Sequence, residues 1–210
     1  MHRLAGRLVR LAVLCAAFLC IAPAANAGPA SDLIAKLNTV FIDVMQNAKA
    51  LGYKGRYEKL EPALVEAYDF KEMTRVTTGR YWRSFTDDQK KQVVAAFHDL
   101  SIATYAARFD GFSGERFEIL GEEPAPAGNL RVNNQIVQAN GEPIHIDYLL
   151  RQDDGKWRII DVYLKSSVSE LAVRRAEFTD ILAKSGFDGL IADLKAKVTK
   201  LHSEGAAASN

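Results

Sequence analysis

Asp147 and Asp161 are the side chains best suited to catalytic chemistry in this sequence of 210 residues. Both lie on strands that we predict to be neighbours, and the strand pairing that we prefer places them opposite each other. In an enzyme with a cone-shaped sheet, such a pair of carboxyl groups could have a raised pKa, and one of them could act as a general base. The alternative is a pair of solvated acids whose charge is offset by Arg151. We favour this alternative because we expect no cover over that face of the sheet.

The other residue types that support catalysis or metal binding are dispersed along the chain. His98, His145 and His202 lie on separate predicted elements, so no two of them have the spacing of a metal-binding pair. The stretch GFSGE does not match the nucleophile motif G-x-S-x-G and does not join a strand to a helix. We therefore expect no catalytic residue, no metal and no cofactor.

The first 27 residues have the three parts of a secretory signal peptide. MHRLAGRLVR is basic, LAVLCAAFLCIA is apolar, and Ala25–Ala27 (ANA) form a cleavage site of small residues. The apolar run is shorter than the roughly 20 residues that a membrane-spanning helix needs. We expect cleavage after Ala27 and export of the rest of the chain.

The exported part of the chain has no thiol, because both cysteines, Cys15 and Cys20, lie in the predicted signal peptide. Disulfides and thiolate sites are therefore excluded there, which is typical of bacterial exported domains that depend on their hydrophobic core. The predicted signal peptide also contains three of the 27 basic residues and none of the 26 acidic ones, so 24 bases and a net charge near −2 remain. Nucleic-acid-binding domains are usually strongly basic. We expect no nucleic-acid partner.

Residues 28–202 are predicted to form one α+β domain, and residues 203–210 a flexible tail. Apolar residues at helical spacing predict helices before and after the strands along the chain, and such a sheet can be packed by helices on one face only. Capping boxes, Thr86 with Gln89 and Ser167 with Glu170, start the long central helix and the first closing helix. Alternation of period two predicts a four-stranded antiparallel meander with strands at about residues 116–121, 130–139, 143–152 and 157–165.

The long central helix is apolar around well over half of its circumference. Phe97 and Leu100 lie on one stripe, and Tyr105 belongs to a second stripe that widens it. A helix of this kind is buried on more than one side. We expect it to lie between the sheet and another helix, or to face a cavity.

The loop of the last hairpin decides which side chains share a face of the sheet. A loop of two or four residues would place Arg151 opposite Arg158, and like charges in that position are unfavourable. A loop of three residues, Asp153–Gly155, separates apolar from polar side chains better, and we predict it. The resulting apolar pairs are Ile144 with Leu164, Ile146 with Val162, and Tyr148 with Ile160. The other face would hold Asp147 with Asp161, His145 with Tyr163, Leu149 with Ile159, and Arg151 with Trp157.

This aliphatic face has two interpretations. It can be part of an ordinary filled core, or it can be the wall of a cavity. The spacing of apolar residues is the same in both cases, so the pattern leaves both open.

The order of motifs along the chain carries further information. GRYEKLEPALVEAYDFKEMTRVTTGRYWRSFTDDQKKQVVAAF is followed by TYAARFDGFSGERFEI and then by IDYLLRQDDGKWRIIDVYLKSSVSELAVRRAEFTDILAKSGFDGLIADL. This series resembles the MlaC or toluene-tolerance family of periplasmic lipid-binding proteins, over about Ser31 to Lys200. Members of that family usually have glycine immediately before the Val-Ser of the closing helix, whereas Ser167 precedes Val168 here. The difference leaves open whether the chain belongs to the hopanoid-associated (HpnM-like) branch.

The resemblance implies a monomeric periplasmic shuttle without covalent chemistry. Such a shuttle carries phospholipid, or hopanoid, between an outer-membrane complex and an inner-membrane transporter, with the lipid tails in a cavity between sheet and helices. From the apolar pattern we predict nine lipid-binding side chains: Phe97, Leu100, Tyr105, Ile144, Ile146, Tyr148, Ile160, Val162 and Leu164. The alternatives are the cone-shaped-sheet enzyme that uses Asp147 or Asp161, and a periplasmic adaptor that binds no ligand.

Overall fold

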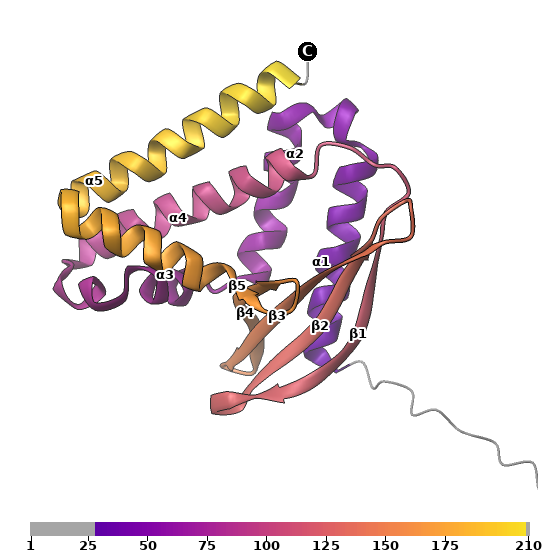
Figure 1. Ribbon diagram of the computed structural model, residues 1–210, viewed down its shortest axis with the longest axis horizontal. Coiled ribbons are helices and arrows are strands. Elements are labelled where there is room, and N and C mark those ends of the chain that lie inside the picture. Colours follow the sequence, from indigo (N-terminus) through magenta and orange to yellow (C-terminus); the bar gives the residue numbers. More distant parts are fainter. Residues whose placement is uncertain (1–27, 209–210) are drawn as a thin grey trace, which may run out of the picture.

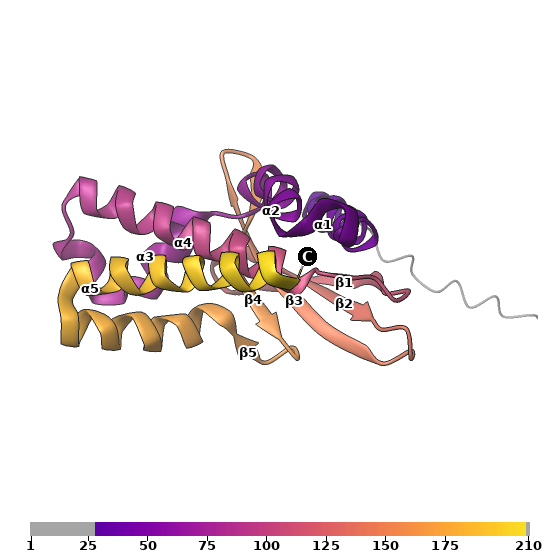
Figure 2. The ribbon, with the colours of Figure 1, turned by 90° about the horizontal axis from the view of Figure 1, so that it is seen from above.

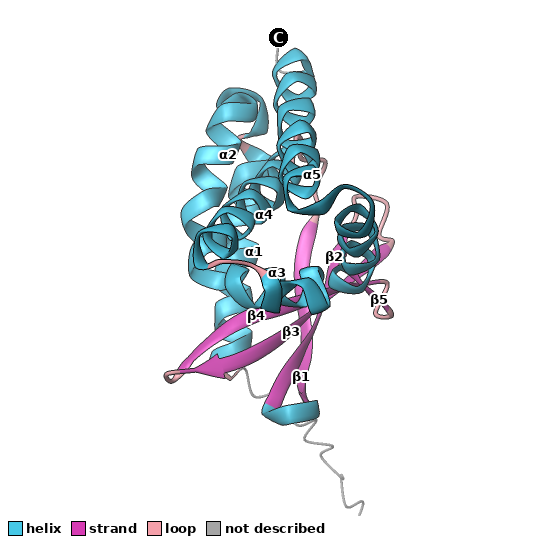
Figure 3. Cartoon of the chain, turned by 90° about the vertical axis from the view of Figure 1, so that its left-hand side faces the viewer, coloured by secondary structure: helices cyan, strands magenta, loops and turns pink. Residues whose placement is uncertain are grey.

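The computed structural model describes residues 28–208 and confirms the α+β class. Helices come first along the chain, an antiparallel sheet follows, and a long helix closes the fold (Figure 1). Figure 3 shows the helices stacked above the strands. The predicted signal peptide, residues 1–27, lies outside the described residues.

The helical layer has five α-helices and a short 3₁₀ segment, and Thr86 starts the longest helix of the first half as predicted. The Thr86 hydroxyl accepts a hydrogen bond from the Gln89 N–H at 3.2 Å, and the Gln89 side chain accepts one from the Thr86 N–H at 3.0 Å. The helical elements are α1 (Pro29–Gln46), α2 (Ala48–Ala67), α3 (Phe70–Thr78), η1 (Gly79–Ser84), α4 (Asp87–Arg108) and α5 (Glu170–Ala208).

Helix α4 lies at the centre of this layer, where it contacts α2, α3 and α5. Its buried side chains include Val93 and Phe97 on one face and Ile102 on the opposite face of the helix. The prediction that this helix is buried on more than one side is therefore confirmed.

Helix α5 starts at Glu170, but its cap differs from the predicted one. The Ser169 hydroxyl accepts a hydrogen bond from the Ala172 N–H at 2.9 Å, so Ser169 caps the helix instead of Ser167. Ser167 lies two residues earlier, in the turn between β4 and β5, where its N–H donates to the Leu164 carbonyl.

A joint at Gly186 divides α5 into two helical arms, and the second arm turns back from the joint at an angle to the first (Figure 1 and Figure 2). The backbone of Gly186 has φ 66° and ψ −166°, a combination that is essentially confined to glycine. The second arm continues to Ala208, so the described part of the tail predicted at residues 203–210 is helical. Close packing of Gly205 on the Tyr53 ring accounts for this extension.

Replacement of Gly186 by alanine should lower the free energy of unfolding by about 1–3 kcal/mol, because a Cβ atom is incompatible with this backbone conformation. No other atom lies within 4 Å of the position of that Cβ, so the effect would come from backbone strain alone. Urea denaturation would measure it. Gly111→Ala is the matched control, since Gly111 is exposed, has open space around it and lacks a positive φ. Equal stability of the two variants would contradict the prediction.

The sheet is an antiparallel meander with five strands, one more than predicted. The additional strand is formed because Lys165 and Ser166, with φ of 50° and 57°, turn the chain back along the preceding strand. The strands, in their order in the sheet, are β1 (Arg116–Ala125), β2 (Asn129–Val137), β3 (Pro143–Asp153), β4 (Lys156–Leu164) and β5 (Val168–Ser169), with a short 3₁₀ turn, η2 (Pro126–Gly128), between β1 and β2.

The predicted register of the β3–β4 hairpin is wrong. The loop has two residues, Asp154 and Gly155, both with positive φ, which is typical of a tight hairpin turn. Together with the extra residue of a bulge in β4, this loop pairs Ile146 with Leu164 and Tyr148 with Val162. The side chains of these pairs still share one face, because the shift from the predicted register is two residues.

The two-residue loop places Arg151 opposite Arg158, which is the pairing of like charges that the sequence argument treats as unfavourable. Each guanidinium has its own partners outside the sheet. Arg151 forms ion pairs with Asp69 at 2.8 Å and Glu72 at 3.3 Å, and Arg158 donates to the Val65 carbonyl at 3.2 Å. These oxygens belong to α2, α3 and the link between them, and they remove the repulsion on which the predicted register depended.

A bulge in β4 changes the face of the residues near the turn. The pairing shifts between Leu149 and Leu150, so that Leu150 pairs with Ile159 and Ile160 is left without a partner in this ladder. Leu150 and Ile159 are both fully buried, whereas Ile160 is only partly buried. Ile159 therefore occupies the place under the helices that we had predicted for Ile160.

The core lies between the helical layer and one face of the sheet. Helix α1 packs across β1, β2 and β4, and the buried side chains of the sheet include Val132 of β2 and Tyr148 of β3. Within residues 28–208, no helix is both long enough and apolar enough to cross a membrane.

Candidate ligand-binding cavity

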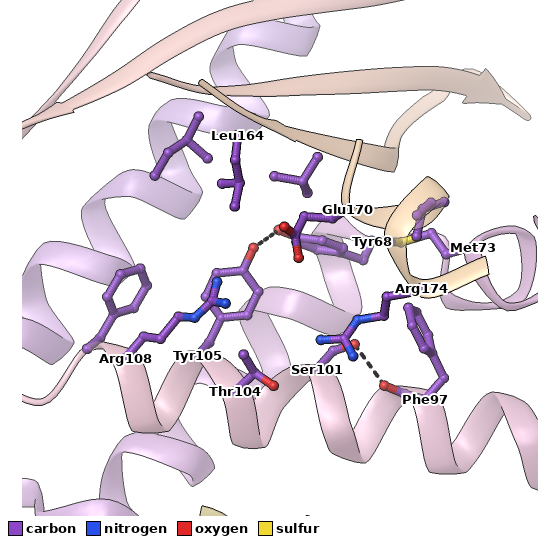
Figure 4. A pocket seen from close by; sticks show the side chains of 14 residues that line it. Tyr68, Met73, Phe97, Ser101, Thr104, Tyr105, Arg108, Leu164, Glu170 and Arg174 are labelled. Carbon is purple, nitrogen blue, oxygen red and sulfur yellow. Dashed lines mark hydrogen bonds between the residues drawn. The ribbon is translucent and has the colours of Figure 1, made fainter. Parts of the chain in front are cut away.

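A cavity of about 130 Å³ lies where α4 and the start of α5 meet the β3–β4 hairpin. Its lining is mostly apolar, and the side chains come from the sheet and from three parts of the helical layer (Figure 4). The lining residues are Tyr68, Met73, Phe97, Ser101, Thr104, Tyr105, Arg108, Phe109, Ile146, Val162, Leu164, Glu170, Leu171 and Arg174.

Helix α4 contributes one continuous side of the cavity, because residues three and four positions apart share a helix face. Phe97 and Tyr105 provide the apolar surface of this side. The hydroxyls of Ser101 and Thr104 donate to carbonyls of their own helix, each at 2.7 Å. These hydroxyls therefore have partners, and the side stays largely apolar.

The opposite side is formed by three aliphatic side chains of the sheet. Ile146 comes from β3, and Val162 and Leu164 come from β4. Ile146 and Leu164 are directly paired across the two strands, so their side chains lie next to each other on the face that points toward the helices.

Two tyrosines meet in the cavity wall. The hydroxyls of Tyr68 and Tyr105 lie 2.5 Å apart and share a hydrogen bond (Figure 4). Burial raises the pKa of Tyr68 well above 10 and also raises the pKa of Tyr105. Burial likewise raises the pKa of Tyr148, in the adjoining core, well above 10. The phenols are therefore neutral in the folded protein.

The free energy of unfolding should fall as the pH rises above about 10, the ordinary pKa of tyrosine. Above that pH the unfolded chain releases phenolic protons that the folded protein keeps, because its tyrosine pKa values are raised. Each such tyrosine adds about 1.4 kcal/mol per pH unit to the decline. Urea denaturation between pH 8 and pH 11 would show whether Tyr148→Phe declines less steeply than the parent protein. Identical slopes would contradict the expectation.

Three charged side chains, Arg108, Glu170 and Arg174, line the cavity together with the apolar residues. Arg108 lies in the last turn of α4, while Glu170 and Arg174 lie in the first turns of α5. None of the three side chains forms a hydrogen bond or ion pair with another residue of the described chain. The apolar cavity thus has charged groups without protein partners in its wall.

Five of the nine predicted lipid-binding residues line this cavity: Phe97, Tyr105, Ile146, Val162 and Leu164. Four do not. Leu100 and Tyr148 are buried in the adjoining core, Ile160 is displaced by the bulge, and Ile144 is 39% exposed near the end of β3. The pattern did not single out Tyr68 and Met73, which reach the cavity from the α2–α3 region.

The predicted pair of Asp147 and Asp161 is not formed. The observed register places Asp147 opposite Tyr163 and Asp161 opposite Leu149. Both side chains are buried instead of solvated, with 1% and 8% exposure, and neither lines the cavity. The geometry that the enzyme interpretation required is therefore absent from the β3–β4 hairpin.

Each of these carboxylates has donors that account for its burial. Asp147 accepts from the Arg131 guanidinium at 2.7 Å and from the Asn134 N–H at 3.1 Å. Asp161 accepts from the Ser169 hydroxyl at 2.6 Å, and from the N–H groups of Val162 at 2.8 Å and of Leu171 at 3.2 Å. Asp161 thus joins β4 to β5 and to the start of α5.

The histidines lie apart. His98 contacts Asp99 at 2.9 Å and Glu61 at 3.9 Å on the surface of α4, whereas His202 packs against Tyr53 and Tyr57. In the part of the chain that the structure covers, no three His, Cys, Asp or Glu side chains are grouped so that they could hold a metal ion.

Comparison with known proteins gives a family, a relative and a structural neighbour. The family model described as MlaC protein matches residues 35–196. A relative from Haemophilus influenzae, the intermembrane phospholipid transport system binding protein MlaC, is 29% identical over 123 residues. That match covers 56% of this chain and 56% of the relative, so the chain spans little more than half the length of the curated relative.

The structural neighbour is a phospholipid-binding protein from Ralstonia solanacearum, solved in complex with a phospholipid. It is 20% identical to this chain, with a TM-score of 0.73, and the match covers 82% of this chain and 98% of the neighbour. At this identity the likeness establishes the shared fold. The family model, which matches well over half of the sequence, establishes that this chain belongs to the MlaC family.

Proposed function

We propose that this protein binds phospholipid in the cavity between α4, α5 and the β3–β4 hairpin and carries it through the periplasm. It would act as the soluble, monomeric component of a lipid transport system, between an outer-membrane complex and an inner-membrane transporter. The observation that carries the proposal is the apolar cavity bounded by sheet and helices, with charged side chains in its wall. Membership of the MlaC family and the phospholipid-bound structural neighbour support the same cargo class.

The physical chemistry of the cavity suits lipid tails. Each buried methylene contributes about 0.8 kcal/mol, so acyl chains need few polar contacts to be held. The cavity, about 130 Å³, is close in size to an engineered cavity of about 150 Å³ that binds benzene. A lipid with two acyl chains is much larger than benzene. Binding therefore requires the walls of the cavity to separate.

The side chains proposed to contact the tails are those of the cavity wall. Phe97 and Tyr105 would contact them from α4, and Ile146, Val162 and Leu164 from the sheet. Met73 and Leu171 complete the apolar lining. The predicted signal peptide would direct export and be cleaved after Ala27, so the protein would act in the periplasm.

Native mass spectrometry of the protein, exported with its own leader and purified from the periplasm without detergent, tests the proposal. We expect a mass increment that corresponds to one or more phospholipid molecules, and lipid extraction of the same sample would identify the headgroup and chains. A hopanoid in the extract would assign the cargo to the hopanoid-associated branch. A protein that shows only its own mass, and that still takes up no lipid from vesicles, would refute the carrier function.

A further inference from the structure

Within residues 28–208, no carboxylate lies within ion-pair distance of Arg108 or Arg174, the two arginines at the cavity. Arg108 reaches the cavity from the end of α4 and is exposed, whereas Arg174 reaches it from α5 and is partly buried. Figure 4 shows the two side chains on either side of the Tyr105 ring. Both guanidinium groups are close enough to the Tyr105 hydroxyl to lower its pKa, against the larger effect of burial.

The missing ion pair between Glu170 and Arg174 is the most informative part of this arrangement. The two residues are four positions apart on α5, with the acid first, which is the spacing and order that favour an ion pair. Further along the same helix, Asp180 pairs with Lys184 at 2.8 Å and Asp193 pairs with Lys197 at 2.6 Å. Glu170 and Arg174 form no such pair, so the Arg174 guanidinium is left available to a group in the cavity.

We propose that Arg108 and Arg174 bind the phosphate of the lipid headgroup while the acyl tails lie against the apolar walls. This inference rests on the proposed function and adds to it the chemical group that the protein recognises. A guanidinium presents parallel N–H donors that match two phosphate oxygens, and hydrogen bonds between charged partners are the stronger ones. With Glu170, the three side chains have a net charge of +1, which suits a phosphodiester with one negative charge.

The test compares two lipids that differ in the phosphate. The lipid-depleted protein is incubated with vesicles that contain equal amounts of phosphatidylglycerol and of diacylglycerol with the same chains, and native mass spectrometry measures the ratio of the two bound lipids. We expect at least a tenfold preference for phosphatidylglycerol. In the double variant Arg108→Gln, Arg174→Gln this preference should be lost, because a hydrogen bond to a charged group typically changes affinity by about tenfold or more.

Arg175→Gln is the matched control, since Arg175 is the next residue of the same helix, is exposed and does not line the cavity. This control should keep the ratio of the parent protein. The ratio also separates recognition from folding, because a variant that folds poorly would lose both lipids together.

Several outcomes would overturn the phosphate site. They are an unchanged ratio in the double variant, an equal change in Arg175→Gln, and a parent protein that binds both lipids without preference. Displacement of bound phosphatidylglycerol by inorganic phosphate at tens of millimolar would show a site for free anions instead of a headgroup site. A parent protein that binds neither lipid would refute the proposed function itself, and that result differs from all of these.

Discussion

Replacement of Ile146 by aspartate should abolish the retention of lipid. Ile146 lies in the cavity wall, where its side chain is paired with Leu164, and no cationic side chain of the sheet lines the cavity beside it. A carboxylate there would have to be buried against acyl chains or be protonated, and either costs several kcal/mol. A cost of about 3 kcal/mol corresponds to a loss of affinity of more than a hundredfold. Lipid extraction from the purified variant would measure the loss.

Ile144→Asp is the matched control for this variant. Ile144 is on the same strand, two residues earlier, and we predicted from the sequence that it would also bind lipid. The structure instead places it outside the cavity with 39% of its surface exposed, so the new carboxylate would be solvated. We expect this variant to keep its lipid. Loss of lipid in both variants, or in neither, would contradict the assignment of the cavity wall, provided that circular dichroism shows both to be folded.

Replacement of Asp161 by alanine should lower the free energy of unfolding by about 3–5 kcal/mol. The buried carboxylate of Asp161 holds the Ser169 hydroxyl at 2.6 Å and the Leu171 N–H at 3.2 Å, so the change leaves buried donors without acceptors. A hydrogen bond to a charged group contributes about 1.5–3 kcal/mol. Urea denaturation at neutral pH would measure the difference.

Asp180→Ala is the control variant with which the loss of stability in Asp161→Ala is compared. Asp180 forms an exposed ion pair with Lys184 on the same helix, and exposed pairs contribute roughly 0–1 kcal/mol. If Asp161→Ala were no less stable than this control, the carboxylate would have no structural role. A functional role for Asp161, as in the enzyme interpretation, would then have to be tested again.

The parts of the fold that depend on neighbouring residues could be predicted from the sequence. The capping box of Thr86 and Gln89 involves residues within one helical turn, and the predicted start of α4 is correct. The register of the β3–β4 hairpin depends on distant residues. Arg151 and Arg158 can lie opposite each other because Asp69 and Glu72 form ion pairs with Arg151, and carbonyls of α2 accept hydrogen bonds from Arg158. None of these partners lies in the hairpin sequence.

The candidate site was predictable to a similar extent. Alternation along β3 places Ile144 and Ile146 on the same face, but it cannot show that the cavity ends between them. In the sequence, the two adjacent arginines of RRAEF, Arg174 and Arg175, are typical of a solvated helix face. Only the three-dimensional arrangement distinguishes Arg174, which reaches the cavity, from Arg175, which does not.

The joint at Gly186 allows the first arm of α5 to rotate as a rigid rod relative to the second arm. The first arm of α5 contributes Leu171 to one wall of the cavity, while Ile191 and Val198 of the second arm lie against α4, which forms another wall. At 1.5 Å per residue the arm from Glu170 to the joint is about 24 Å long, so a rotation of about 5° at the joint would move its far end by about 2 Å. A small change in the φ and ψ of Gly186, an exposed residue that does not line the cavity, would thus change the width of the cavity.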